Sequence, residues 1–386
     1  MTKRLSALLV VLTLSITGFM SCDTAKETET EIETETETET ETETETDTTD
    51  PTSVITESSE SSFESESEDT EALDKPAPPQ SYEHPEGYVF TLNEDKQSYT
   101  LSEYTGEYAD LTIPSLVCDT PVTAIAQNVF SLCKTLKGVV VSDGITEIGQ
   151  GAFQQCSALE SISLPSTLVS LGRDAFVLCT SLKSLDIPEG ITKIEWGILQ
   201  GCSSLESVSI PSTVTEIGSY AFADCGSLKS ISIPKGVVSI GTGIILGCSS
   251  LESITVDSGN SKYHSQGNCL IDTAAKTLIG GCKTSVIPND NSVEAIGQEA
   301  FRALSTLVSI SVPDSVKLLD TSAFADCAEL TEITVGSGLK TVNALVFDGC
   351  KKLSTVNYNG SEEDWKKINI SIINDYFTKA SRNYMK

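Results

Sequence analysis

The chain repeats itself every 23 residues, and this period restricts its possible folds more than any other feature. Residues 146–168 read TEIGQGAFQQCSALESISLPSTL, and residues 215–237 read TEIGSYAFADCGSLKSISIPKGV. About nine segments share the spacing. A repeat of this length predicts a solenoid, in which each unit packs only on its neighbours. Because solenoids build long surfaces rather than deep clefts, the repeat also favours binding over catalysis.

The first 22 residues have the pattern of a signal peptide. Lys3 and Arg4 precede an apolar stretch over residues 5–19, which is too short to span a bilayer comfortably. The segment ends in Ser21 and Cys22 and resembles the lipid-attachment sequence of bacterial lipoproteins. That resemblance implies a lipid on Cys22 and an extracytoplasmic protein tethered to the membrane. Ordinary secretion with an unmodified Cys22 remains the alternative.

Residues 23–80 are acidic and of low complexity. They hold 21 acidic residues and two lysines, in a chain whose net charge is −30. Alternating Glu and Thr has no apolar surface to bury and repels itself, which predicts a disordered, extended stalk. The acidic balance also argues against nucleic acid as a partner, because nucleic-acid binding needs clustered Lys and Arg.

The remaining chain divides into three predicted parts. Apolar and polar residues alternate between Tyr88 and Val117, which indicates strands. Residues 81–122 are therefore predicted to form an N-terminal β cap. Residues 123–362 form the solenoid, interrupted by an insertion at about 260–293 in which residues 268–279 read as a hairpin. Ser361 is expected to cap a short helix ending near Trp365, within a C-terminal cap over residues 363–386.

Each coil is predicted to contain one strand and one inward side chain that recurs from coil to coil. Residues 159–164 alternate apolar and polar until Pro165 ends the strand, so stacked coils predict one parallel sheet face. Phenylalanines recur at the same place and should stack as a spine, with Leu199 and Ile245 substituting in two coils. The phenylalanines are Phe130, Phe153, Phe176, Phe222, Phe301, Phe324 and Phe347.

Cysteines also recur with the period, and Leu304 replaces one of them. This substitution favours buried thiols that act as small apolar plugs. A zinc site is less consistent with the sequence, since the chain has only two histidines. Cys269 and Cys282 lie outside the register and are the better disulfide candidates. The periodic cysteines are Cys133, Cys156, Cys179, Cys202, Cys225, Cys248, Cys327 and Cys350.

Three groups of residues are candidate ligand contacts. Trp196 and Tyr220 are large side chains at repeat positions that are small or polar elsewhere, such as Gln150 and Ser219, although local packing is the alternative. A ladder of hydroxyls on the outward strand positions suits a glycan or an extended peptide, and equally a plain solvated surface; it includes Ser207, Ser209, Ser230 and Ser232. The insertion adds Tyr263 and His264 as a possible recognition loop.

The repeat resembles the BspA-like (Treponema pallidum-type) leucine-rich repeat family. The motif I-G-x-x-A-F-x-x-C-x-x-L-x-x-I-x-I-P is nearly intact over residues 148–165 and 217–234. This resemblance implies a bacterial or protist surface protein that takes part in adhesion, without shared catalytic residues.

Together these features predict a membrane-tethered, cell-surface binding protein with a protein or polysaccharide ligand. The alternative is a structural component of the envelope or cell wall. The repeat region offers no nucleophile–histidine pair and no glycine-rich phosphate loop, so an enzyme, a cofactor and a metal site are not expected. The solenoid is expected to be monomeric.

Overall fold

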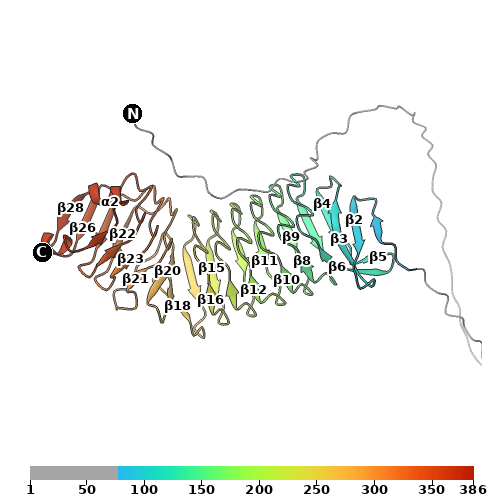
Figure 1. Ribbon diagram of the computed structural model, residues 1–386, viewed down its shortest axis with the longest axis horizontal. Helices are drawn as coiled ribbons and strands as arrows, with labels where there is room; N and C mark the ends of the chain where they lie inside the picture. Colours follow the sequence, from blue (N-terminus) through green and yellow to red (C-terminus); the bar gives the residue numbers. More distant parts are fainter. Residues whose placement is uncertain (1–76) are drawn as a thin grey trace, which may run out of the picture. The chain divides into compact units, whose positions relative to one another are not determined.

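The 23-residue repeat winds into a solenoid of about twelve turns, and its strands stack in two parallel rows (Figure 1). The computed structural model describes residues 77–386, which form one unit. Cys22 and most of the predicted stalk lie outside the described residues. Strand pairs keep the period of the sequence: Ser184 lies beside Ser207, and Ile194 lies beside Ile217.

The first row contains the strands that the sequence predicts. Their outward residues are mostly small and polar, and their inward residues are mostly Ile, Val or Leu. The row consists of β4 (Asp110–Ile113), β7 (Gly138–Val141), β9 (Ser161–Ser163), β11 (Ser184–Asp186), β13 (Ser207–Ser209), β15 (Ser230–Ile233), β17 (Ser253–Val256), β22 (Ser309–Val312), β24 (Glu332–Val335), β26 (Thr355–Tyr358) and β28 (Ser381–Tyr384).

A second row of shorter strands follows the turn after each first-row strand, so the prediction of a single sheet face was incomplete. Most of these strands have two residues, too few to give an alternating pattern in the sequence. The row consists of β6 (Thr120–Ile125), β8 (Glu147–Ile148), β10 (Ser170–Leu171), β12 (Lys193–Ile194), β14 (Glu216–Ile217), β16 (Ser239–Ile240), β21 (Ala295–Ile296), β23 (Leu318–Leu319), β25 (Thr341–Val342) and β27 (Asn369–Ile370).

Both ends of the solenoid are closed by cap elements. At the N-terminal end, β1 (Ser81–Glu83), β2 (Tyr88–Leu92) and β3 (Tyr99–Tyr104) form an antiparallel meander, and β5 (Leu116–Val117) pairs with β6. At the other end lie α1 (Glu362–Trp365) and α2 (Asp375–Lys379). The predicted N-cap is present, because Ser361 accepts a hydrogen bond from the Asp364 amide at 3.2 Å. Cap strands continue both rows, and the turn count therefore exceeds the nine predicted coils.

The predicted phenylalanine spine is confirmed. Rings of successive coils stack almost parallel, with centroids 4.9 Å apart for Phe130 and Phe153 and 5.1 Å apart for Phe301 and Phe324. The stack extends beyond the repeat, since Phe377 of α2 lies 4.5 Å from Phe347. Each of these rings is essentially buried. Truncating one to alanine is therefore expected to cost about 3–5 kcal/mol.

The cysteine ladder is buried except for the half-buried Cys133, and it does more than fill space. From Cys156 onward, each thiol lies at hydrogen-bond distance from a main-chain carbonyl 26 residues earlier. For example, Cys179 Sγ donates to the Phe153 oxygen at 3.1 Å, and Cys350 Sγ donates to the Phe324 oxygen at 3.0 Å. The position therefore uses a weak donor as well as a small apolar group.

The insertion is a three-stranded antiparallel unit rather than a lone hairpin. Its strands are β18 (Tyr263–Gln266), β19 (Cys269–Asp272) and β20 (Thr277–Gly281), and β20 then pairs in parallel with β21. The unit therefore continues the second row between β16 and β21 (Figure 1). Gly281 lies so close to the spine that a Cβ atom there would come 2.1 Å from Phe301 Cε1.

Cys269 and Cys282 are both free thiols, so the disulfide considered for them is not formed. Their side chains belong to different halves of the core. Cys282 packs with the N-terminal coils, and Cys269 packs with the C-terminal coils.

Candidate binding surfaces

A turn on every coil holds a residue in the left-handed conformation, and this turn positions the candidate aromatic residues. Successive coils place Asn128, Gly151, Asp174, Gly197 and Tyr220 there, all with φ between 57° and 61°. Glycine alternates with a larger residue whose side chain covers it. A Cβ atom on Gly197 would lie 2.6 Å from Asp174 Oδ1. The alternation leaves room for one large side chain in every second coil.

Trp196 and Tyr220 lie on neighbouring coils, and their rings are in contact. Their rings lie 5.8 Å apart at 72°, an edge-to-face contact, and both side chains are half-buried. The Arg173 guanidinium lies 5.0 Å from the centre of the Trp196 ring, within range of a cation–π interaction. Three coils thus bring Arg, Trp and Tyr together on one patch of the turn face.

The patch continues through an ionic chain across the insertion. The Tyr220 hydroxyl donates to Glu299 Oε2 at 3.0 Å, although 79 residues separate them in sequence. Glu299 is only 6% exposed and is paired with Arg302 at 2.7 Å. Arg302 also contacts Asp326 at 3.3 Å. We call the series Arg173, Trp196, Tyr220, Glu299, Arg302 and Asp326 the aromatic–ionic row.

Burial shifts the ionisation of one group in this row and of one group beside it. Desolvation, with the neighbouring Glu299 carboxylate, raises the pKa of Tyr220. Desolvation also raises the pKa of Asp174, and this effect exceeds the lowering of the pKa by the neighbouring Arg173. Asp174 Oδ1 is buried without a hydrogen-bond partner, while Oδ2 contacts Arg173 at 3.4 Å. An under-satisfied acceptor on Asp174 therefore lies beside the row.

Sequence inspection did not identify Glu299 and Arg302 as members of this surface. The signal was present, since Glu299 occupies the left-handed turn position that holds Gly243 in the preceding repeat coil. This repeat position predicts the contact with Tyr220 only if the insertion preserves the register of the coils. The structure meets this condition, because the Gly247 amide donates to the Arg302 carbonyl at 3.2 Å.

The predicted hydroxyl ladder lies on the exposed face of the first row. Ser184 and Ser207 are paired, as are Ser230 and Ser253, and all but the half-buried Ser253 are exposed. Ser207, Ser209, Ser230 and Ser232 thus share one flat surface. Beside it, lysine and glutamate side chains of neighbouring coils form ion pairs, including Lys183 with Glu160 at 2.7 Å. Such exposed pairs contribute about 0–1 kcal/mol each.

The insertion residues differ in their availability. Tyr263 was predicted as a possible ligand contact, but it is 5% exposed, and its hydroxyl accepts a hydrogen bond from the Ile240 amide at 3.0 Å. It therefore anchors the insertion to β16 and offers no surface to a ligand. His264 is half-buried, with Nδ1 2.8 Å from Thr273 Oγ1.

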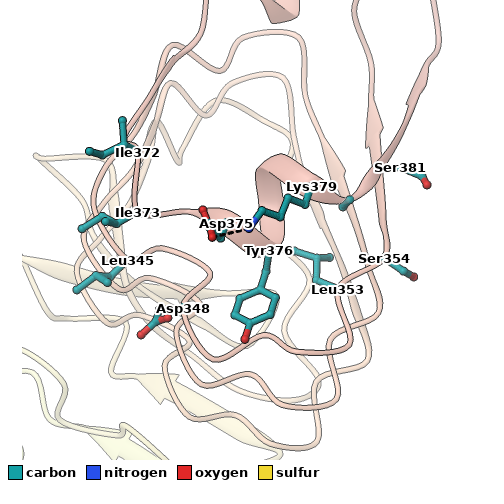
Figure 2. Close-up of a pocket in the computed structure, with 11 residues that line it drawn as sticks. Leu345, Asp348, Leu353, Ser354, Ile372, Ile373, Asp375, Tyr376, Lys379 and Ser381 are labelled. Carbon is teal, nitrogen blue, oxygen red and sulfur yellow. Dashed lines mark hydrogen bonds and ion pairs between the residues drawn. The ribbon is translucent and has the colours of Figure 1, made fainter. Parts of the chain in front are cut away.

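A further hollow, of about 690 Å³, lies beside the C-terminal cap (Figure 2). Leu345, Ile372 and Ile373 form one rim, with Ser354 and Ser381 on the far side. Across it, Asp375 and Lys379 of α2 form an exposed ion pair at 2.6 Å. This hollow was not predicted from the sequence, because it arises where the last coil meets the cap.

Within residues 77–386, no three His, Cys, Asp or Glu side chains are grouped as metal ligands. The helices within these residues include no candidate for a membrane span.

Comparisons with known proteins agree with the fold. Residues 100–225, 198–268 and 276–377 match the BspA type leucine rich repeat region. A leucine rich cell surface protein from Faecalibacterium prausnitzii is 28% identical over 76% of this chain and 98% of its own, with a TM-score of 0.55. The pneumococcal vaccine antigen PcpA is 18% identical over 72% of this chain and 82% of its own, with a TM-score of 0.60, and shares the fold.

No curated protein matches the chain. The repeat matches nevertheless cover most of the described residues. The break between the second and third matched ranges, residues 269–275, falls within the inserted unit. The chain belongs to the BspA-type leucine-rich repeat family.

Proposed function

We propose that this protein is a cell-surface binding protein that engages a protein or glycan ligand through the aromatic–ionic row. The observation that carries the proposal is the gathering of Arg173, Trp196 and Tyr220 on one patch of the turn face. Arg, Trp and Tyr are the residue types that dominate binding energy at interfaces. Half-buried aromatic rings offer contact area at a low cost in conformational entropy.

The proposed location is outside the cytoplasm, with a lipid on Cys22 and residues 23–80 as a stalk that holds the solenoid away from the membrane. The similarity to a leucine rich cell surface protein supports this location. A solenoid that lacks a recognisable catalytic constellation also supports binding rather than catalysis. Mass spectrometry of the mature N-terminus tests the anchor, since a diacylglyceryl mass on Cys22 is expected and an unmodified Cys22 would contradict it.

A binding screen tests the ligand proposal. Full-length protein carrying Cys22→Ser, which removes the lipid, is assayed against immobilised extracellular-matrix proteins and bacterial wall glycans. Saturable binding is expected to one ligand, and Trp196→Ala is expected to weaken it at least tenfold, the loss of about 1.4 kcal/mol or more that a hot-spot residue shows.

Tyr108→Ala provides a matched control, because Tyr108 is an exposed aromatic residue, at 51%, outside the row. Equal loss in both variants would contradict a role for the row. No binding to any candidate would favour the alternative, a scaffold of the envelope without a specific ligand. Turnover of substrates in a broad hydrolase panel would contradict the proposal that the protein is not an enzyme.

A further inference from the structure

The surface beside the C-terminal cap combines a protruding apolar side chain with a hollow. Ile372 is 92% exposed, the highest value for any large hydrophobic side chain in residues 77–386. Ile373 and Leu345 beside it are 48% and 38% exposed. The hollow next to them reaches the buried Leu353 and the ring of Tyr376 (Figure 2). Contiguous exposed apolar side chains of this kind mark an interaction site.

The charges on this surface are self-complementary. Asp375 and Lys379 lie one helical turn apart on α2, and their side chains are 66% and 74% exposed. When two copies of α2 lie antiparallel about a twofold axis, Asp375 of each copy faces Lys379 of the other. Ile372 and the hollow lie on the same surface as these charges. A twofold interface requires such a patch, in which one surface carries both the knob and the hole.

From this arrangement we infer that the surface formed by Leu345, Ile372, Ile373, Asp375 and Lys379 pairs two copies of this chain. The area is small and its ion pair is exposed, so the contact is weak and reversible in dilute solution. Tethering to a membrane raises the effective concentration of each copy near its neighbours and so favours the dimer. This consequence rests on the proposed surface location. Two ligand sites on one assembly then bind multivalently. The inference replaces the expectation of a monomer.

Sedimentation velocity of the full chain carrying Cys22→Ser, over a wide range of concentration, tests the inference. The sedimentation coefficient is expected to rise with concentration toward that of a dimer. Ile372→Glu is expected to abolish the rise, because it places charges against the partner's apolar hollow. Val286→Glu serves as the control, since Val286 is a 72% exposed valine on the inserted unit, and this variant is expected to dimerise normally.

A charge exchange tests the orientation. Asp375→Lys alone and Lys379→Asp alone place like charges opposite each other and are expected to weaken the dimer several-fold. The double variant restores opposite charges and is expected to recover it. A chain that stays monomeric at all concentrations, or a dimer unaffected by Ile372→Glu, would overturn the inference. So would a double variant no better than the single ones. None of these outcomes bears on the Trp196 binding screen.

Discussion

The Tyr220 hydroxyl and the Glu299 carboxylate form a 3.0 Å hydrogen bond that joins the coils on the two sides of the insertion. The two side chains meet above Gly243, which lies between them in the stack. A Cβ atom on Gly243 would come 2.8 Å from the Tyr220 ring and 3.0 Å from Glu299 Oε2. The contact therefore requires glycine at position 243, where φ is +65° and a side chain would overlap both partners.

Tyr220→Phe is expected to destabilise the protein by about 1.5–3 kcal/mol, because it removes a hydrogen bond to a buried carboxylate. Chemical denaturation measures the change in the free energy of unfolding. Tyr108→Phe is the control, since Tyr108 is exposed and its loss of a hydroxyl should change stability by less than about 0.5 kcal/mol. Equal effects in the two variants would show that the bond across the insertion contributes nothing.

Gly281→Ala is expected to destabilise the protein by about 1–3 kcal/mol, because the added methyl group would overlap the Phe301 ring. Gly226→Ala is the matched control. A Cβ atom there meets nothing closer than 3.9 Å, so this variant should be neutral or slightly stabilising. Thermal unfolding of both variants measures the difference, and a Gly281→Ala protein as stable as the control would disprove the close contact with the spine.

The ladder thiols are expected to resist alkylation in the folded protein. Burial raises the pKa of Cys202 and Cys248 to about 12, so both remain neutral at pH 8. Cys118 is exposed and should react. Alkylation at pH 8 followed by peptide mass mapping measures this. Ladder peptides labelled as fast as the Cys118 peptide would contradict the buried, hydrogen-bonded ladder.

The same shifts predict a loss of stability at alkaline pH. An unfolded thiol ionises near pH 9, whereas the folded Cys202 and Cys248 thiols ionise near pH 12. The folded state therefore binds more protons between these values, and the free energy of unfolding falls as pH rises from about 9 to 12. Denaturation series across this range measure the slope, and Cys202→Ala is expected to make it shallower. An unchanged slope would contradict the assignment.

Asp174→Asn is expected to keep or increase stability at pH 7, because burial of the Asp174 carboxylate disfavours its charged form. Asn128 shows that this turn position accepts asparagine with positive φ. Since the folded pKa is raised, the carboxylate weakens the fold only above its unfolded pKa, and the two proteins should converge at acidic pH. Denaturation at both pH values compares them, and Glu107→Gln is the control for removing a carboxylate at an exposed site. A variant clearly less stable at pH 7 would contradict this reading.

The features that recur at the same position in every repeat were predictable from the sequence. Phe130, Phe153 and Phe176 stack, as do Phe301, Phe324 and Phe347, because each of these coils places a phenylalanine at the same inward position. The second row was missed, because pairs such as Glu147 and Ile148 are too short to show alternation. The thiol hydrogen bonds were missed for a different reason. Leu304 at a ladder position suggests that the position only needs an apolar side chain, so the sequence does not indicate that a thiol donates there.

The candidate site was predictable only where the repeat changes residue type within one stack. Trp196 and Tyr220 differ from their counterparts in other coils, and their contact follows from the 23-residue spacing. Glu299 and Arg302 follow the insertion, whose effect on register cannot be read from residue counts. The hollow beside Ile372 depends on how α2 packs on the last coil, and no repeat precedes it to show the pattern.

Tryptophan fluorescence tests the central claim most directly, because the chain has two tryptophans and only Trp196 lies in the aromatic–ionic row. Trp365 is 7% exposed in the C-terminal cap, so Trp365→Phe leaves Trp196 as the single reporter. Titration of this variant with the ligand found in the binding screen is expected to shift the Trp196 emission saturably, with the same Kd as an independent binding assay. Saturable binding without any change in Trp196 emission would contradict a ligand site at this row.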